Sequence, residues 1–387
     1  MTIASASELI DRAVSATGLA DFGPDGWREG LERLVATMSE REFGPKAERR
    51  MEHRLAGVLA SRLKVEHWIA THPEVLDQKV EGPVFILGLP RTATTALQAL
   101  LCNDPQWRYL RDWEADEPVP PPVAGEEHSD PRVQALTANH DDGGVGQNLH
   151  IHEAGGPVDD AALLRLDFHN QELGWPAASY TRWWRDSDMS SAYAYHERVL
   201  KLLQSRRPPN RWLVKAPWHN FHIESLARQY PGARFVMCHR DPAQVIPSVA
   251  SLVTTVHRAF MGEAATDPHA VGSFVLEHLS ISIGRVMQFR KLHGDDRFIN
   301  VRHGQFNADP FGTVEHIYDW LGTGLSEEAR ATMSAWHERN RKGAHGEHRY
   351  SPEDFGLTVE AIRERFATYI TDFDFGGSTA TPGNSHQ

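Results

Sequence analysis

Short apolar runs alternate with helical segments in the middle of this chain, and this alternation limits the fold more than any other feature. The first apolar run, PVFILG at residues 83–88, is typical of a buried strand, and a helical pattern follows at 94–102. The same order recurs later, with expected strands at 211–216, 233–238 and 298–302 and expected helices at 219–229 and 243–256. Strands that alternate with helices indicate βαβ crossovers. We therefore predict an α/β fold with a central parallel sheet flanked by helices.

The segments around this region differ in character. Residues 1–80 carry apolar side chains at helical spacing among many charges, and we expect Ser5 or Ser7 to cap the first helix and Asp25 the second. The last residues, GGSTATPGNSHQ, have the composition of a disordered segment. We predict three units, namely a helical N-terminal segment (1–80) packed on the main domain, the main domain itself (81–374) with helical insertions, and a flexible tail (375–387).

Composition excludes several classes of function. The chain has 387 residues and a formal net charge of -12, which argues against a nucleic-acid or anionic-membrane surface. Its two cysteines, Cys102 and Cys238, suit a reducing compartment and offer no disulfide framework. No run approaches the roughly 18 apolar residues of a membrane span, and the N-terminus lacks a signal sequence. We expect a cytoplasmic protein without a transmembrane segment, and a homo-oligomer remains open.

The loop after the first strand has the form of an anion-binding turn. It reads GLPRTATT at residues 88–95, where a nucleotide triphosphatase P-loop would read G-x-x-x-x-G-K-[ST]. Ala93 stands in place of the second glycine and Thr94 in place of the lysine, while Arg91 brings a cation into the turn. Backbone N–H groups and the helix dipole would still favour an anion here. We predict a P-loop-like three-layer fold whose loop binds an anion other than a magnesium-bound triphosphate.

Polar side chains at two other strand ends are expected at the same edge of the sheet. Lys215 ends one expected strand and His219 begins the following helix, while Arg240 follows the next strand and Ser248 lies two turns into its helix. Taken singly, these residues fit a solvated strand end, a helix cap and a local ion pair of Arg240 with Asp241. Their joint placement beyond the carboxyl ends of parallel strands instead favours a binding site.

These motifs, taken in order, resemble those of the bacterial sulfotransferase family. The resemblance rests on GLPRTATT, RYLRDWEADEPVPPP, LVKAPWHN, ARFVMCHRDPAQVIPSVASL and NRKGAHGEHRYSPEDFGL, and it spans residues 81–374. Members of that family use 3′-phosphoadenosine-5′-phosphosulfate (PAPS) as the sulfuryl donor. The resemblance implies the following donor-binding residues: Pro90, Arg91, Thr92, Ala93, Thr94 and Thr95 around the 5′-phosphosulfate, Arg240 and Ser248 on the 3′-phosphate, and Arg341, Lys342 and Gly343 closing over that phosphate.

Ala93 departs from this pattern, because family members usually carry glycine at the equivalent position. A positive φ at this residue would strain an alanine, whereas a right-handed helical conformation would tolerate it. The departure is the one feature of the loop that the resemblance does not explain.

The expected chemistry follows from the residues. By analogy with phosphoryl transfer, sulfuryl transfer needs positioning and charge neutralisation, which Arg91 and Lys215 would supply without a metal. Lys215 would stabilise the bridging oxygen as negative charge grows on it. His219 is the first choice as the general base for the acceptor hydroxyl, because the ordinary pKa of a histidine, about 6.5, suits this role. A buried or capping histidine is the alternative.

Other residues compete with His219 for the role of base. The segment NLHIHEAGGPVDD contains His150, His152, Glu153, Asp159 and Asp160, and one of these would orient His219 or act as the base itself. The His150, His152 and Glu153 cluster lacks a further ligand at a recognised metal-site spacing, so we predict no metal.

The acceptor is less well defined by the sequence. The aromatic residues Trp107, Trp113, Trp175, Trp183 and Trp184 and the tyrosines near them either pack in the core or line an apolar pocket. A pocket of this kind would favour a small-molecule or lipid alcohol as acceptor. Two rival functions remain at this stage. A small-molecule kinase would need the missing loop lysine and a magnesium-binding acid, whereas a non-catalytic nucleotide-binding protein would need only the donor site.

Overall fold

A five-stranded sheet forms the centre of the protein. The computed structural model describes residues 3–40, 45–127, 129–134, 155–171, 178–208, 210–261, 266–340 and 351–375. The strands are β1 (Val84–Gly88), β2 (Trp107–Arg108), β3 (Arg211–Lys215), β4 (Arg234–His239) and β5 (Phe298–Arg302). They lie in the order β2-β3-β1-β4-β5, and every neighbouring pair is parallel. The predicted α/β fold with a parallel central sheet is confirmed.

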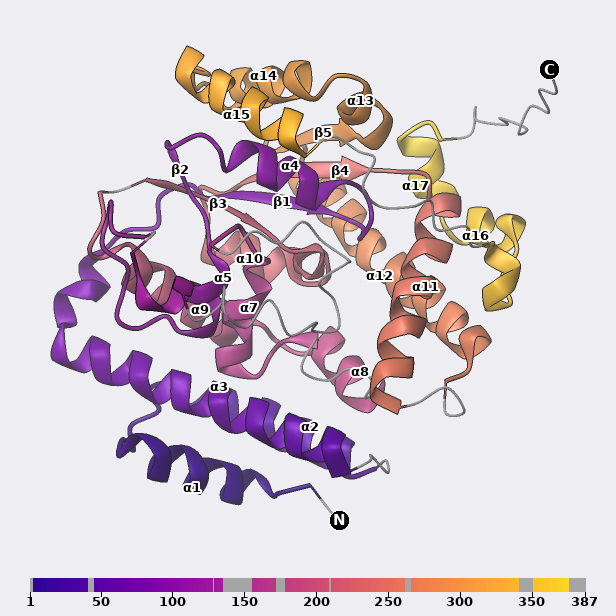
Figure 1. The fold of residues 1–387 in the computed structure, drawn as a ribbon. Coiled ribbons are helices and arrows are strands. Elements are labelled where there is room, and N and C mark those ends of the chain that lie inside the picture. The colour runs from indigo at the N-terminus through magenta and orange to yellow at the C-terminus, as the bar shows by residue number, and fades with distance from the viewer. Residues whose placement is uncertain are drawn as a thin grey trace.

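Helices cover both faces of the sheet (Figure 1). Alternate residues of β1 point to opposite faces, so Val84 and Ile86 pack in one core cluster and Phe85 and Leu87 in the other. The first cluster includes residues of α4 (Thr94–Leu101), α13 (His303–Ala308), α14 (Pro310–Leu321) and α15 (Glu327–Arg339). The second includes residues of α9 (Ser190–Gln204), α10 (Ile223–Gln229), α11 (Pro242–Met261) and α12 (Pro268–His293). This arrangement is the predicted three-layer sandwich.

Shorter elements complete the described chain. They are η1 (Pro73–Asp77), α5 (Asp112–Asp116), α7 (Ala161–Leu164), η2 (Arg165–Asp167), α8 (Ala178–Asp186), η4 (Pro217–His222), η6 (Pro352–Phe355), α16 (Val359–Arg365) and α17 (Ala367–Asp372). Within the described ranges, no helix combines the length and the apolar character that a membrane crossing requires. The tail after residue 375 lies outside the described residues.

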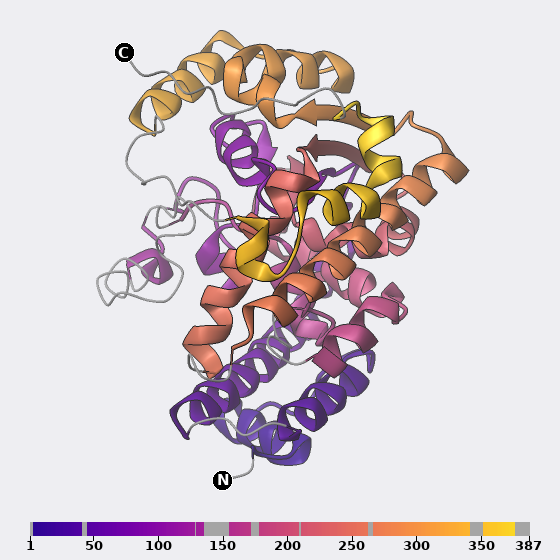
Figure 2. The same cartoon turned by 90° about the vertical axis from the view of Figure 1, so that its right-hand side faces the viewer.

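Three helices precede the sheet and lie at the opposite end of the molecule from α13–α15 (Figures 1 and 2). They are α1 (Ala6–Thr17), α2 (Trp27–Ser39) and α3 (Pro45–Thr71). Ser5 caps α1 as expected, in a capping box with Glu8. The expected cap at Asp25 is wrong, because Gly26 occupies the N-cap of α2 and the Asp25 carboxylate pairs with Arg28 instead.

A buried arginine joins these helices to the rest of the protein. Arg62 on α3 is fully buried, and its guanidinium donates to the carbonyl oxygens of Phe22, Pro24 and Leu166 at 2.8, 2.5 and 2.7 Å. The same group lies 3.1 Å from the Asp167 carboxylate. Because α3 and the residues around Asp167 share this one cation, their packing depends on it.

The expected helix at 219–229 differs from the structure at its start. Residues Pro217–His222 form the 3-10 helix η4, and α10 begins only at Ile223. His222 at the junction has φ -128° and ψ 33°, outside the α-helical region, so the two segments do not form one continuous helix. His219 and Asn220 consequently lie in the tighter turn, where both are fully buried.

Candidate active site

The loop between β1 and α4 is shaped by a glycine that no other residue can replace. Gly88 has φ 146°, and a Cβ at this position would lie 2.6 Å from the Cys238 carbonyl oxygen and 2.9 Å from the Thr92 hydroxyl. Thr92 donates its hydroxyl to the Leu89 carbonyl at 2.7 Å, which closes the turn. Asn220 also supports the loop, because its side-chain amide donates to the Gly88 carbonyl at 3.1 Å.

Two residues of the loop have left-handed backbones without being glycine. Arg91 has φ 66° and Ala93 has φ 72°, and Ala93 is the N-cap of α4. The right-handed conformation that would have tolerated alanine is therefore absent at residue 93. A left-handed conformation costs an L-residue about 1–2 kcal/mol, and such strain concentrates at functional sites. The turn brings the first N–H groups of α4, which lack carbonyl partners within the helix, into the loop.

This strain leads to a measurable expectation. Ala93→Gly is expected to raise the free energy of unfolding by about 1 kcal/mol, because glycine adopts a positive φ without a Cβ penalty. Ala96→Gly on α4 is the matched control, and we expect it to lower stability by about 1 kcal/mol through its poorer helix propensity. Urea unfolding of both variants measures the two changes. A destabilised Ala93→Gly protein would show that the left-handed alanine carries no strain.

Three predicted donor-binding residues join the loop to α11 and to the end of β4. The Arg91 side chain donates from Nε to the Ser248 hydroxyl at 3.2 Å. Arg240 donates from Nη1 to the Arg91 carbonyl oxygen at 2.9 Å and from Nε to Gln244 at 3.2 Å. The Asp241 carboxylate lies 3.7 Å from the guanidinium of Arg363, a residue of α16. The structure thus brings Arg91, Arg240 and Ser248 together, while residues 341–343 lie outside the described chain.

Lys215 lies on the other side of the same loop. It ends β3, and its side chain is only 4% exposed. Its ammonium group donates to the Thr95 hydroxyl at 3.2 Å and forms an ion pair with the Asp159 carboxylate. The Asp159 side chain keeps 32% of its surface exposed. Thr94, the other threonine predicted to bind the donor, is buried at the first position of α4.

His219 lies in the interior and contacts Asp160, the residue after Asp159. Its Nε2 is 2.9 Å from Asp160 Oδ2, and its Nδ1 is 2.9 Å from the Tyr193 hydroxyl. His196 contacts the same carboxylate oxygen through Nε2 at 3.0 Å and the Tyr230 hydroxyl through Nδ1 at 2.7 Å. Because a carboxylate only accepts, both histidines donate to it and accept from their tyrosines when neutral. Both nitrogens of His219 are therefore occupied.

The charge of Asp160 holds this buried network together. Burial alone would raise the pKa of Asp160, but the electrostatic interaction with His219 and hydrogen bonds from both histidines outweigh it, and the pKa lies below its usual range. The Asp160 backbone N–H also donates to the Lys215 carbonyl at 3.3 Å. Asp160 thus fixes the chain at the position where the neighbouring Asp159 meets the Lys215 ammonium group.

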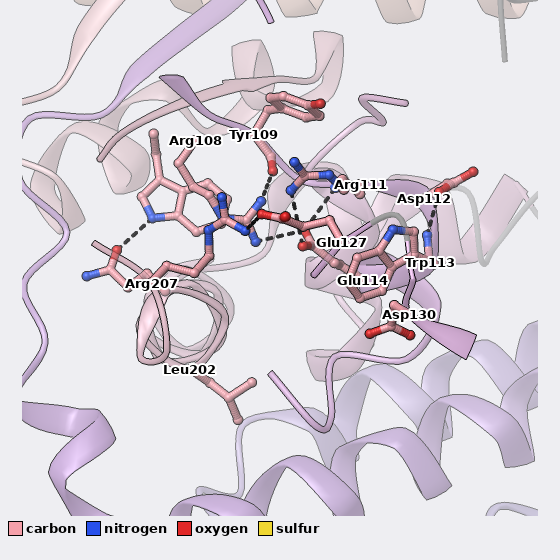
Figure 3. A network of polar contacts seen from close by, with 12 residues as sticks. Arg108, Tyr109, Arg111, Asp112, Trp113, Glu114, Glu127, Asp130, Leu202 and Arg207 are labelled. Carbon is pink, nitrogen blue, oxygen red and sulfur yellow. Dashed lines mark hydrogen bonds and ion pairs between the residues drawn. The ribbon is translucent and has the colours of Figure 1, made fainter. Parts of the chain in front are cut away.

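The segment after α4 contains a buried network of ion pairs. Figure 3 shows Glu114 between the guanidinium groups of Arg108 and Arg111, at 2.8 and 3.5 Å. Glu114 is fully buried, so these cations neutralise a carboxylate that has no access to water. Arg111 also forms an isolated antiparallel β-bridge with Pro157, two residues before Asp159.

Several residues predicted for the acceptor pocket or the base lie in the core or outside the described residues. Most of the aromatic side chains considered for an acceptor pocket, including Trp113, Trp184 and Tyr193, are at most 2% exposed and belong to the core. His150, His152 and Glu153 fall outside the described residues, as does Trp175. Over the ranges that are described, no three histidine, cysteine, aspartate or glutamate side chains are grouped as a metal site.

Comparison with known proteins agrees with this fold. The model of the family described as "Sulfotransferase family" matches residues 83–327, which span the loop, Lys215, Arg240 and Ser248. The chain belongs to the sulfotransferase family.

Two solved structures of mycobacterial proteins are similar over nearly the whole chain. The crystal structure of sulfotransferase STF9 from Mycobacterium avium superposes with a TM-score of 0.91 at 32% identity, covering 96% of this chain and 97% of that one. Sulfotransferase STF1 from Mycobacterium tuberculosis H37Rv superposes with a TM-score of 0.83 at 30% identity, covering 95% and 99%. The helical N-terminal segment is therefore shared with these structures.

A third relative is matched over a shorter region. The omega-hydroxy-beta-dihydromenaquinone-9 sulfotransferase Stf3 of Mycobacterium bovis is 26% identical over 177 residues, which cover 44% of this chain and 42% of that protein. The chain thus spans less than half the length of this relative.

Proposed function

We propose that this protein is a PAPS-dependent sulfotransferase that transfers a sulfuryl group to the hydroxyl of a lipid or other apolar alcohol. The observation that carries the proposal is the meeting of three cations at one edge of the sheet. Arg91 comes from the loop after β1, Lys215 from the end of β3 and Arg240 from the end of β4. Parallel sheets bind ligands at this edge, and three cations suit a ligand with several anionic groups.

The residues around the loop fit the two ends of such a donor. The N-terminus of α4 with Thr94 and Thr95 suits the 5′-phosphate, because N–H groups and hydroxyls are its natural donors. Arg240 and Ser248 suit the 3′-phosphate, which distinguishes PAPS from ATP. The contact of Arg91 with Ser248 supports a single continuous site for both phosphates. The contribution of Arg341, Lys342 and Gly343 remains a prediction.

The transfer itself needs charge neutralisation more than covalent chemistry. The bond between sulfur and the bridging oxygen of the donor breaks, a bond between sulfur and the acceptor oxygen forms, and the acceptor proton passes to a base. Lys215 would neutralise the charge that grows on the bridging oxygen, and Arg91 would hold the sulfonyl oxygens. Both are buried or held by hydrogen bonds, so little reorganisation is required.

We assign the base to Asp159, while His219 acts through Asp160. Asp159 is partly exposed and touches Lys215. Its carboxylate would therefore meet the acceptor hydroxyl beside the bound donor. His219 is fully buried and has both nitrogens occupied, so it lacks a free lone pair for a substrate proton. A carboxylate that takes up a proton as the new bond forms is sufficient for general base catalysis.

The proposed acceptor class rests on the relative whose name states its acceptor. Stf3 is named for a hydroxylated menaquinone, which is a long apolar alcohol. The chain is strongly acidic overall, at -12, which disfavours a highly charged glycan as acceptor. A lipid alcohol is therefore the acceptor class that we propose.

The donor assignment predicts a preference that can be measured. Adenosine 3′,5′-bisphosphate is expected to raise the melting temperature clearly more than ATP with magnesium at equal concentration, because only the bisphosphate engages Arg240 and Ser248. Arg240→Ala should weaken bisphosphate binding about 10- to 100-fold, as expected for losing a charge-assisted hydrogen bond. Arg182→Ala, a change of an exposed arginine on α8, is the matched control and should bind normally. Equal stabilisation by ATP with magnesium would favour the rival kinase function.

A further inference from the structure

A cavity lies between α3 and the helices α5 and α7, and none of its lining residues belongs to the loop after β1. Its volume is about 510 Å³, which is within the range of sites that bind small molecules. It follows one side of α3 from Arg50 to Lys64, a length of about 21 Å at the helical rise. We call it the α3 groove, and its defining residues are Arg50, Arg54, Gly57, Lys64, Arg165 and Leu166.

The middle of the α3 groove is apolar and open. Gly57, Val58 and Ala60 of α3 face Ala162 and Leu166 across it. A Cβ built on Gly57 meets no atom within 4 Å, so the space above this residue is unfilled. An apolar chain that entered the groove would bury this surface, at a gain of about 25 cal/mol for each Å².

The rim of the α3 groove is positively charged in a chain that is acidic overall. Four of its side chains are arginine or lysine and two are acidic, an excess of two positive charges, whereas the whole protein carries -12. One acidic residue, Asp116, is already paired with Arg165 at 3.3 Å. Arg50 and Lys64 are exposed, and neither makes an ion pair with another residue in the described ranges.

We propose that the α3 groove binds a single-chain anionic amphiphile. The alkyl chain would lie along Gly57 and Leu166, and a sulfate, phosphate or carboxylate headgroup would meet one exposed cation at an end of the groove, either Arg50 or Lys64. Both parts of the match are needed, because the apolar floor alone would accept any hydrocarbon and the cations alone would accept any small anion. The proposal does not depend on the proposed sulfuryl transfer, because no lining residue of the α3 groove is among the proposed donor-binding or catalytic residues.

Filling the groove tests the apolar part of the proposal. Titration calorimetry with monomeric decyl sulfate should show saturable binding to the full-length protein, and Gly57→Leu should weaken it at least about tenfold. The Gly57→Leu protein should fold, because the added side chain enters open space and replaces a helix-interior glycine. Gly284→Leu on α12, where an added Cβ also meets nothing within 4 Å, is the matched control. Equal binding to wild type and Gly57→Leu would overturn the site.

Charge is tested with the same titration. The double change Arg50→Gln and Lys64→Gln should weaken decyl sulfate binding at least about tenfold, whereas Lys291→Gln, an exposed lysine on α12, should not. Neutral decanol should bind wild type more weakly than decyl sulfate does. Equal affinity for decanol, or binding to anionic vesicles without binding to monomeric decyl sulfate, would contradict the proposal.

Discussion

Asp159→Asn is expected to lower kcat for sulfuryl transfer by about 10²- to 10⁴-fold, the contribution typical of a general base. Asparagine keeps the size and the hydrogen-bonding reach of the side chain but cannot take up the proton of the acceptor. Binding of adenosine 3′,5′-bisphosphate should change little, because the proposed donor contacts are made by the loop, Arg240 and Ser248. The measurement is steady-state transfer from saturating PAPS to a long-chain alcohol, with bisphosphate binding measured in parallel.

His219→Gln is the comparison that separates a base from a positioning residue. Glutamine can still donate to Asp160, so we expect kcat to fall less than about tenfold while stability falls by about 1–3 kcal/mol, as for other buried polar groups left partly unsatisfied. The opposite pattern would return the role of base to His219. That pattern is full activity in Asp159→Asn together with loss of transfer in His219→Gln at unchanged stability.

Arg62→Met is expected to lower the free energy of unfolding by about 3–5 kcal/mol. Methionine fills part of the volume but leaves the Asp167 carboxylate, which is 2% exposed, without its cation, and leaves the carbonyl groups of Phe22 and Leu166 without donors. The arginine also stacks on the Tyr195 ring at 3.8 Å, a contact that methionine replaces only in part. Urea unfolding at neutral pH measures the change.

Arg12→Met is the control for this prediction. Arg12 pairs with Glu52 at 2.8 Å, but its side chain is 52% exposed, so solvent screens the pair and we expect little loss of stability. Similar small losses in both variants would mean that the N-terminal helices are held by apolar packing and not by the buried arginine.

The fold was predictable where strands are short continuous apolar runs. The run at 298–302 coincides with β5. The ends of β1, β3 and β4 each lie within one residue of the expected ends. Several elements were not predicted, and β2 and α12 illustrate two different reasons. β2 has only two residues, too few for a periodic pattern. On α12, buried polar side chains such as His278 and Ser282 interrupt the apolar periodicity that would indicate a helix.

The sequence predicts the cations at the sheet edge better than the buried polar network around His219. Order along parallel strands predicts that Arg91, Lys215 and Arg240 share one edge, because topology alone brings strand ends together. The burial of His219 was not predictable in the same way. It depends on His196 and Tyr193, which come from a distant helix and approach Asp160 only in the folded chain. The sign of φ at Ala93 likewise follows from the backbone and not from the residue type.

Direct observation of transfer tests the central claim. The protein is incubated with PAPS carrying a radiolabelled sulfuryl group and with a panel of lipid, phenolic and sugar alcohols, and labelled products are separated from the donor. We predict labelled sulfate ester on a lipid alcohol without added metal, with Lys215→Ala as the inactive control. Absence of product from every alcohol, despite tight binding of adenosine 3′,5′-bisphosphate, would contradict the proposed sulfotransferase activity. It would favour a non-catalytic nucleotide-binding protein.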